Sequence, residues 1–184
     1  MPIRNTTARW GAIAQLFHWV IVALIITQFV LINIEGNLPL GLQKLIWLAR
    51  HKSVGITILG LAILRLIWRW MNPTPGLPDT LKPYERVLAH VTHVGLYVLL
   101  FIMPLTGWMM SSARNFPVSW FNLVQLPDLV GPNRALYDTL HTTHEVLAWL
   151  LVGVATLHVL AALKHHFFLK DDTLRRMLPF TRPR

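Results

Sequence analysis

The sequence predicts an all-α membrane protein, a bundle of four transmembrane helices that forms a single integral membrane domain over residues 1–184. The 184 residues are 54% hydrophobic and only 14% charged, whereas soluble globular proteins carry about 25% charged residues. Their mean hydropathy is +0.48. Four apolar stretches with few charges reach the roughly 20 residues that a helix needs to cross a bilayer. These stretches are residues 10–34, 46–70, 87–111 and 139–168.

The first stretch begins near Trp10, carries His18 about two turns in and ends near Asn33. It is too long for the apolar region of a signal peptide, and no small-residue cleavage site follows it. We therefore expect it to be a membrane helix. Glycine and proline in the loop over residues 35–45 end it.

The second stretch places His51 in its first turns, between Arg50 and Lys52. Gly55 follows four residues later on the same helix face. A glycine there lets either a flat ligand or a neighbouring helix approach the backbone, and the sequence leaves both open. The proline-rich run over residues 72–78 then predicts a rigid loop.

The third stretch follows Pro83 and has His90 and His93 about one turn apart, with Pro104 as an expected kink. These two histidines either contact a cofactor or cap the helix surface. The longest loop, residues 113–138, comes next. Its aromatic run over residues 117–123 is expected to lie along the membrane interface.

The fourth stretch carries His144 and His158, fourteen residues apart. On a helix this spacing puts both within roughly 40° of one face and about 21 Å apart along the axis. They cannot share one zinc ion, whose ligands lie within about 2.3 Å of the metal. The layout suits two flat cofactors held at different depths.

The distribution of positive charge predicts the orientation. With the N-terminus inside, twelve of the 17 lysines and arginines fall at the inner ends of the helices and five at the outer ends. The positive-inside rule then places both short basic tails in the cytoplasm. This asymmetry accounts for the net charge of +9, so nucleic acid is not an expected partner. The outer five are Lys44, Arg50, Lys52, Arg114 and Arg134.

With this orientation, four histidines form two pairs at matched depths: His18 with His158 near the inner surface, and His51 with His144 near the outer surface. Ionisable groups inside a membrane bundle are costly and usually functional. Ligation of one haem iron by each pair would use all four and leave no open coordination site. The alternative for each is a core histidine bonded to a carbonyl. The absence of cysteine excludes thiolate ligands and iron–sulfur clusters.

Seven segments of the chain form a combination typical of one family: residues 16–19, 50–55, 73–75, 104–107, 143–145, 156–168 and 170–174. Through them the chain resembles the bacterial cytochrome b561 proteins, four-helix electron carriers of the inner membrane that hold two b-type haems. The resemblance implies haem ligation by the same four histidines and electron exchange with ubiquinone. Some members are superoxide oxidases.

Two further groups are candidate sites. His165 lies two turns beyond His158 on the same face, and with Lys164 and His166 it would contact either a quinone headgroup or phospholipid. Arg50, Lys52 and Arg114 would either bind haem propionates or form a positive funnel that attracts a small anion such as superoxide. His141 is expected to face solvent.

The predicted function is transmembrane electron transfer by a superoxide:ubiquinone oxidoreductase, which oxidises superoxide at the periplasmic face and reduces ubiquinone near the cytoplasmic face. The alternative is a haem b subunit or carrier that serves a partner dehydrogenase, similar to the membrane anchors of formate dehydrogenases and hydrogenases, with residues 113–138 as the docking surface. A metal or ion transporter is disfavoured, because the histidines lie at two depths and intramembrane carboxylates are scarce.

Overall fold

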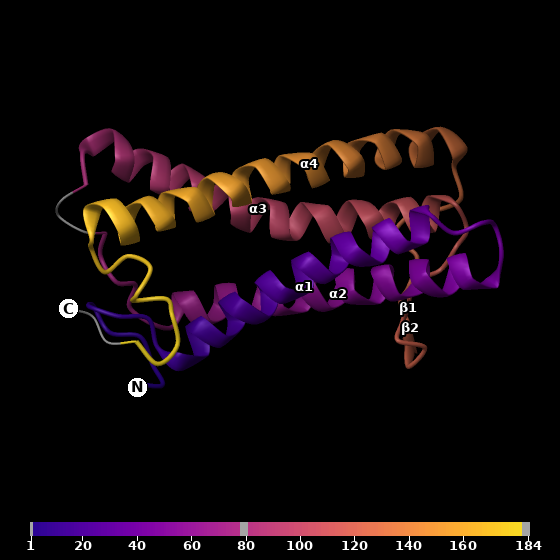
Figure 1. Ribbon diagram of the computed structural model, residues 1–184. Coiled ribbons are helices and arrows are strands. Elements are labelled where there is room, and N and C mark those ends of the chain that lie inside the picture. The colour runs from indigo at the N-terminus through magenta and orange to yellow at the C-terminus, as the bar shows by residue number, and fades with distance from the viewer. Residues whose placement is uncertain (1, 78–80, 182–184) are drawn as a thin grey trace. The chain divides into compact units, whose positions relative to one another are not determined.

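The computed structural model describes residues 2–77 and 81–181, and four long helices follow one another in this part of the chain (Figure 1). All four are long and apolar enough to cross a membrane, the last of them continuing to Leu169. The predicted all-α class with four membrane-length helices is therefore confirmed. The helices are α1 (Ala12–Gly36), α2 (Leu42–Trp70), α3 (Pro83–Ala113) and α4 (Arg134–Lys164).

The outer surfaces of the helices are apolar. In the most apolar window of each helix, between 6% and 28% of the residues are buried inside the protein. Large side chains such as Trp149 and Leu160 are 74% and 56% exposed. Exposing so much apolar area to water would cost about 25 cal/mol per Å². Lipid is therefore the solvent in which this surface is stable.

The chain divides into two compact units, and each contains a section of every long helix. We call Met1–Val20, Ile63–Val98 and Leu150–Arg184 the terminal unit. We call Ile21–Ala62 and Leu99–Trp149 the central unit. Pro78 of the predicted proline-rich loop and the last three residues of the basic tail lie outside the described residues.

The core of the central unit joins α1, α2 and α3. Ala62 is completely buried, and this small side chain lets the helices approach closely. The buried members of the cluster are Ile21, Leu31, Val54, Ile58, Ala62 and Leu100.

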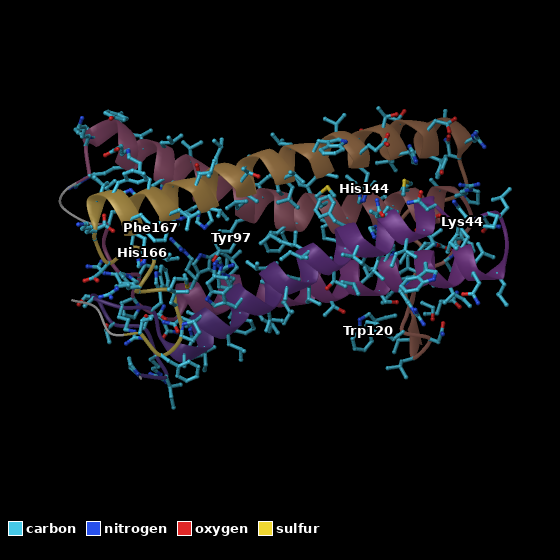
Figure 2. All side chains as sticks on the ribbon, viewed as in Figure 1. Lys44, Tyr97, Trp120, His144, His166 and Phe167 are labelled. Atoms are coloured by element: carbon cyan, nitrogen blue, oxygen red, sulfur yellow. The ribbon has the colours of Figure 1, made fainter. Side chains whose placement is uncertain are left out.

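A short hairpin in the loop before α4 packs on α2, also within the central unit. Its antiparallel strands are β1 (Ser119–Trp120) and β2 (Val124–Gln125), joined through Phe121 and Asn122 at positive φ. The Trp120 indole donates to Thr57 Oγ1 at 3.0 Å (Figure 2). This tryptophan thus binds α2, and the location of residues 117–123 along the membrane interface stays a prediction.

The two ends of the chain pack together in the terminal unit. Gln15 Nε2 on α1 donates to the carbonyl of Arg176 at 3.0 Å, and the Trp19 indole donates to the carbonyl of Met177 at 2.9 Å. At the start of α1, Gly11 is needed because a Cβ there would overlap the backbone of Ile3 and Arg4. The segment predicted only as a basic tail is therefore a packed part of the fold.

Helix α4 begins five residues before the predicted start. The Asn133 side chain accepts the backbone N–H of Leu136 at 3.0 Å, and Arg134 pairs with Asp138 at 3.1 Å. An N-cap and an ion pair stabilise a polar first turn that a hydropathy window does not detect. At its other end, α4 continues as a π-helical turn, η1 (His165–Leu169).

Replacing Ser53 by alanine should loosen the hairpin. The buried Ser53 hydroxyl accepts the N–H of Phe121 at 3.0 Å and lies 3.1 Å from the carbonyl oxygen of Ser119. Loss of these bonds should cost about 1–3 kcal/mol. Amide hydrogen exchange over residues 119–125 should become faster and thermal unfolding in detergent should start lower. Thr139→Ala, which removes an exposed hydroxyl bonded to its own helix, is the control. Equal rates of amide hydrogen exchange over residues 119–125 in the two variants would contradict this role of the Ser53 hydroxyl.

Candidate functional site

One histidine pair lies in the terminal unit. His18 on α1 and His158 on α4 have ring centres 6.3 Å apart, with their planes at 77°. A third imidazole, His93 on α3, lies 5.3 Å from the His158 ring. Among the described residues, the buried Nδ1 atom of His18 has no hydrogen-bond partner. The alternative of a core histidine bonded to a neighbouring carbonyl through this atom therefore does not fit His18.

The second pair lies in the central unit and repeats this geometry. His51 on α2 and His144 on α4 have ring centres 6.4 Å apart, again with their planes at 77°. The structure thus brings together each of the two pairs that the sequence predicts.

The spacing within each pair fits a shared metal ion. Two imidazoles on opposite sides of one metal ion, with bonds of about 2.0–2.1 Å as histidine makes to zinc, have ring centres roughly 6 Å apart. In the described part of the chain, no three histidine or acidic side chains form a group suited to a metal ion. Two ligands per site fit a metal whose other ligands come from a flat macrocycle such as haem.

The surroundings of His144 leave one nitrogen free for a metal. The Thr106 hydroxyl donates to the carbonyl of Met103 at 2.8 Å, and its oxygen lies 3.0 Å from His144 Nδ1. Since the hydroxyl hydrogen is already used, His144 Nδ1–H is the donor in this contact. Nε2 then keeps its lone pair, which is how a second hydrogen bond fixes the tautomer of a ligating histidine.

Gly107 makes room for the His144 ring, which Figure 2 shows extending from α4. A Cβ at position 107 would lie 3.1 Å from His144 Cε1 and 3.5 Å from Nδ1. Gly55 has another role, because a Cβ there would meet the Gln28 amide on α1 at 3.1 Å. Of the two roles left open for Gly55, close helix packing is therefore the one supported.

The candidate cations of the central unit bind aromatic rings and carbonyl groups. Arg50 stacks on Trp47 at 4.6 Å. Lys52 Nζ donates to the carbonyl of Phe116 at 3.2 Å and lies 3.6 Å from its ring centre. Arg114 donates to the Tyr137 hydroxyl at 2.8 Å.

Two of the five cations that the sequence predicts to lie outside are neutralised. Lys44, labelled in Figure 2, pairs with Glu35 at 3.5 Å, and Arg134 pairs with Asp138. In the described part of the chain, no carboxylate pairs with Arg50, Lys52 or Arg114, so these three charges remain available to an anion.

Two of the three candidates at the end of α4, His165 and Lys164, already have polar partners within the terminal unit. His165 is buried, and its Nδ1 lies 2.5 Å from Asp171 Oδ2. Burial raises the pKa of Asp171, but hydrogen bonds from His165 and Thr173 outweigh this effect and hold the pKa below its usual value. Lys164 pairs with Glu85 at 2.9 Å. His166 is half-buried beside the Phe167 ring (Figure 2).

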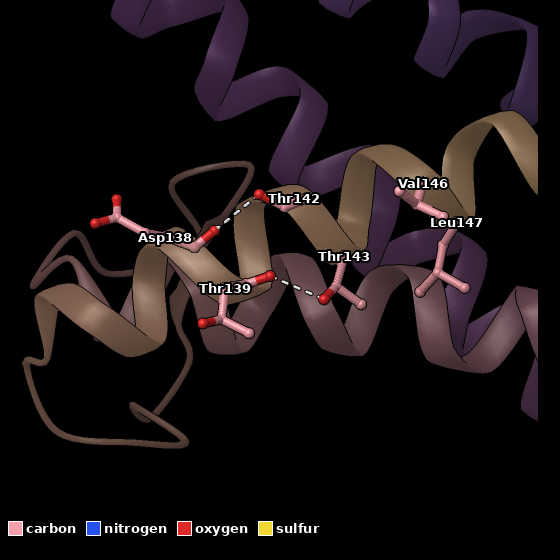
Figure 3. A pocket seen from close by; sticks show the side chains of 6 residues that line it. All are labelled: Asp138, Thr139, Thr142, Thr143, Val146 and Leu147. Atoms are coloured by element: carbon pink, nitrogen blue, oxygen red, sulfur yellow. Dashed lines mark hydrogen bonds between the residues drawn. The ribbon is translucent and has the colours of Figure 1, made fainter.

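His141 is exposed beside Glu145, as expected. A surface hollow near it is lined only by residues of α4, among them Thr142 and Thr143 (Figure 3). Both hydroxyls donate to carbonyls of their own helix, so the hollow offers a ligand no free donor from these two side chains.

Sequence reasoning missed two groups of residues near the pairs. Thr106 was included in the prediction only as part of the matching segment 104–107. Its contact with His144 joins residues thirty-eight positions apart, and such a contact leaves no pattern in the local sequence. Arg65 and Arg69 were counted only as inner charges. They lie one turn apart inside an apolar run, and that placement alone marks them as unusual.

The comparisons with known proteins identify the family of this chain. The family model described as prokaryotic cytochrome b561 matches residues 9–180. "Cytochrome b561 homolog 2" of Escherichia coli (strain K12) is 34% identical over 97% of this chain and 95% of its own length. "Probable superoxide oxidase CybB" of Yersinia pestis is 36% identical over 88% of this chain and 91% of its own length. "Cytochrome b561 homolog 1" of Escherichia coli (strain K12) is 27% identical over 88% of this chain and 92% of its own length. With four membrane-length helices and a family match over nearly all of its residues, the chain belongs to the prokaryotic cytochrome b561 family.

Proposed function

We propose that this family member transfers electrons across the bacterial inner membrane through two b-type haems, one held by His18 and His158 and the other by His51 and His144. The observation that carries the proposal is the matching geometry of the two pairs, with ring centres 6.3 and 6.4 Å apart and planes at 77° in both. When bound, haem supplies reversible one-electron chemistry at its iron.

The protein's own residues would hold and orient this group. The Thr106 oxygen fixes the tautomer of His144, and Gly107 leaves room for its ring. Because two histidines would hold each haem iron, no coordination site would be left for dioxygen or superoxide. Electrons would instead enter and leave by outer-sphere transfer.

At the periplasmic end, we propose superoxide as the electron donor, the substrate that one relative's name suggests for that relative. Arg50, Lys52 and Arg114 would raise its local concentration through their unpaired positive charges. Each superoxide gives up one electron and leaves as dioxygen. Two of them, with one quinone and two protons, would yield two dioxygen molecules and one quinol.

At the cytoplasmic end, ubiquinone would accept the electrons near His165, with Lys164 and His166 as further candidate contacts. His165 Nδ1 is bonded to Asp171, so its Nε2 is the atom that would face a quinone oxygen. This assignment rests on the predicted orientation, with both termini in the cytoplasm.

A second candidate function is electron transfer for a partner dehydrogenase, without superoxide activity. The name of the Escherichia coli relative that matches 97% of this chain mentions no superoxide. A partner that co-purifies in equal amount would favour this function, and full quinone reduction by the isolated chain would contradict it.

Replacing one histidine of a pair should remove one haem. Purified wild-type protein should contain two haems per chain by the pyridine haemochrome assay, and His144→Ala and His158→Ala should each contain one. His141→Ala, which removes an exposed histidine of the same helix, should keep both. Two haems in either ligand variant, or none in the wild type, would reject the assignment.

The oxidised protein should give a strongly anisotropic low-spin electron paramagnetic resonance spectrum. With ligand planes at 77°, each imidazole interacts with a different iron d orbital, so the two orbitals stay close in energy. His158→Ala should lose about half of this intensity. A spectrum typical of parallel imidazoles would contradict the geometry.

Neutralising the unpaired outer cations should slow superoxide oxidation. The double variant Arg50→Gln, Arg114→Gln should lose roughly tenfold in stopped-flow rate at low salt, at the lower end of electrostatic steering effects. The difference from wild type should shrink at high salt because ions screen the charges. Arg134→Gln, whose guanidinium is already paired, is the control. A double variant with the wild-type rate and full haem content would reject the funnel.

A further inference from the structure

Two arginines on α2 face one aromatic ring inside the terminal unit. The guanidinium carbons of Arg65 and Arg69 lie 5.4 and 5.8 Å from the ring centre of Tyr97 on α3 (Figure 2). Arg69 also lies 5.8 Å from the Trp10 ring. One turn apart on one helix face, the two positive charges repel each other.

These charges have no carboxylate partner in the described part of the chain, although Arg65 lies well inside a membrane-length helix. Withdrawing a guanidinium from water is costly when no anion pairs with it. A cation–π contact offsets only part of that cost. Two half-buried guanidinium groups side by side therefore suit an anion with more than one carboxylate or phosphate group.

The position of the cluster indicates which anion this is. Tyr97 lies one turn beyond His93 on α3, and the His93 ring lies 5.3 Å from the His158 ring, all in the same unit. An anion bound by Arg65 would thus lie beside the His18–His158 pair. Haem b carries two propionate carboxylates on one edge of its ring, so it would bring two negative charges to two arginines. A lipid phosphate usually carries one charge and stays at the membrane surface.

We propose that Arg65 and Arg69, held by Tyr97, bind the propionate carboxylates of the haem at the His18–His158 pair, and that Arg65 thereby raises its reduction potential. The inference deepens the proposed function and depends on its haem assignment. A fixed positive charge favours the iron(II) state, because reduction removes one positive charge from the site. The bidentate fork of arginine suits a carboxylate better than lysine does.

A redox titration of the purified protein, followed in its visible spectrum, tests the proposal. Arg65→Gln should lower one of the two midpoint potentials and leave the other unchanged. The expected change is about tenfold in the equilibrium constant for reduction, which is 59 mV for a one-electron couple. Arg65→Lys should recover part of the shift because it restores the charge without the fork. Arg4→Gln, an exposed arginine of the same unit, should change neither potential.

Two further measurements keep the test decisive. If Arg65→Gln loses haem, Tyr97→Phe removes only the hydroxyl, and a smaller shift of the same sign is expected. Redox-induced infrared difference spectra of protein with haem ¹³C-labelled at its propionates should show carboxylate bands that move in Arg65→Gln. Unchanged potentials and unchanged bands with two haems present would overturn the proposal, as would a potential that responds only to anionic lipid. A wild-type protein without haem would instead refute the proposed function.

Discussion

The approach of one α4 imidazole to an imidazole of another helix is the constraint on which the rest of the structure depends. His158 meets His18 in the terminal unit, and His144 meets His51 in the central unit. A polar ring in an apolar bundle is costly unless it is bonded. Bringing two together at a set distance fixes the register of α4 against α1 in one unit and against α2 in the other. The Gly107 site follows from the same constraint, since a side chain there would crowd the His144 ring.

Charge balance shapes the surroundings of both pairs. The chain has 17 lysines and arginines but only 8 aspartates and glutamates, so most cations cannot pair with a carboxylate. Aromatic rings and carbonyl groups act as partners of these cations in place of carboxylates. Arg50 contacts Trp47, Lys52 contacts Phe116 and Arg65 contacts Tyr97. Such contacts orient a cation without neutralising it, so its field still acts on a cofactor or on an approaching anion.

The histidine pairs could be predicted from the sequence because helical periodicity and the distribution of positive charge can both be read from the order of residues along the chain. His144 and His158 share a stripe of one helix, and counting charges sets the depth of His18 and His51. Contacts between segments that lie far apart in the sequence could not be predicted in this way. Trp120 binds Thr57, and Gln15 binds the carbonyl of Arg176. Neither contact has a local pattern, because each depends on how a loop or a tail folds back onto a helix.

The equal geometry of the two pairs has a consequence for energetics. If each pair holds a haem as proposed, the same ligand type, the nearly equal ring separations and the same interplanar angle would give the two haems no reason to differ in reduction potential. Any difference must come from their surroundings. In the terminal unit, the His93 ring lies 5.3 Å from His158, and Arg65 and Arg69 contact Tyr97 one turn beyond His93. In the central unit, the Thr106 oxygen lies 3.0 Å from the Nδ1 atom of His144. Cations favour the reduced state, and a hydrogen bond accepted from Nδ1–H strengthens the ligand and favours the oxidised state. In the proposed function, both effects would make a haem held by His18 and His158 the better electron acceptor, and transfer to it from a haem held by His51 and His144 would be the downhill direction.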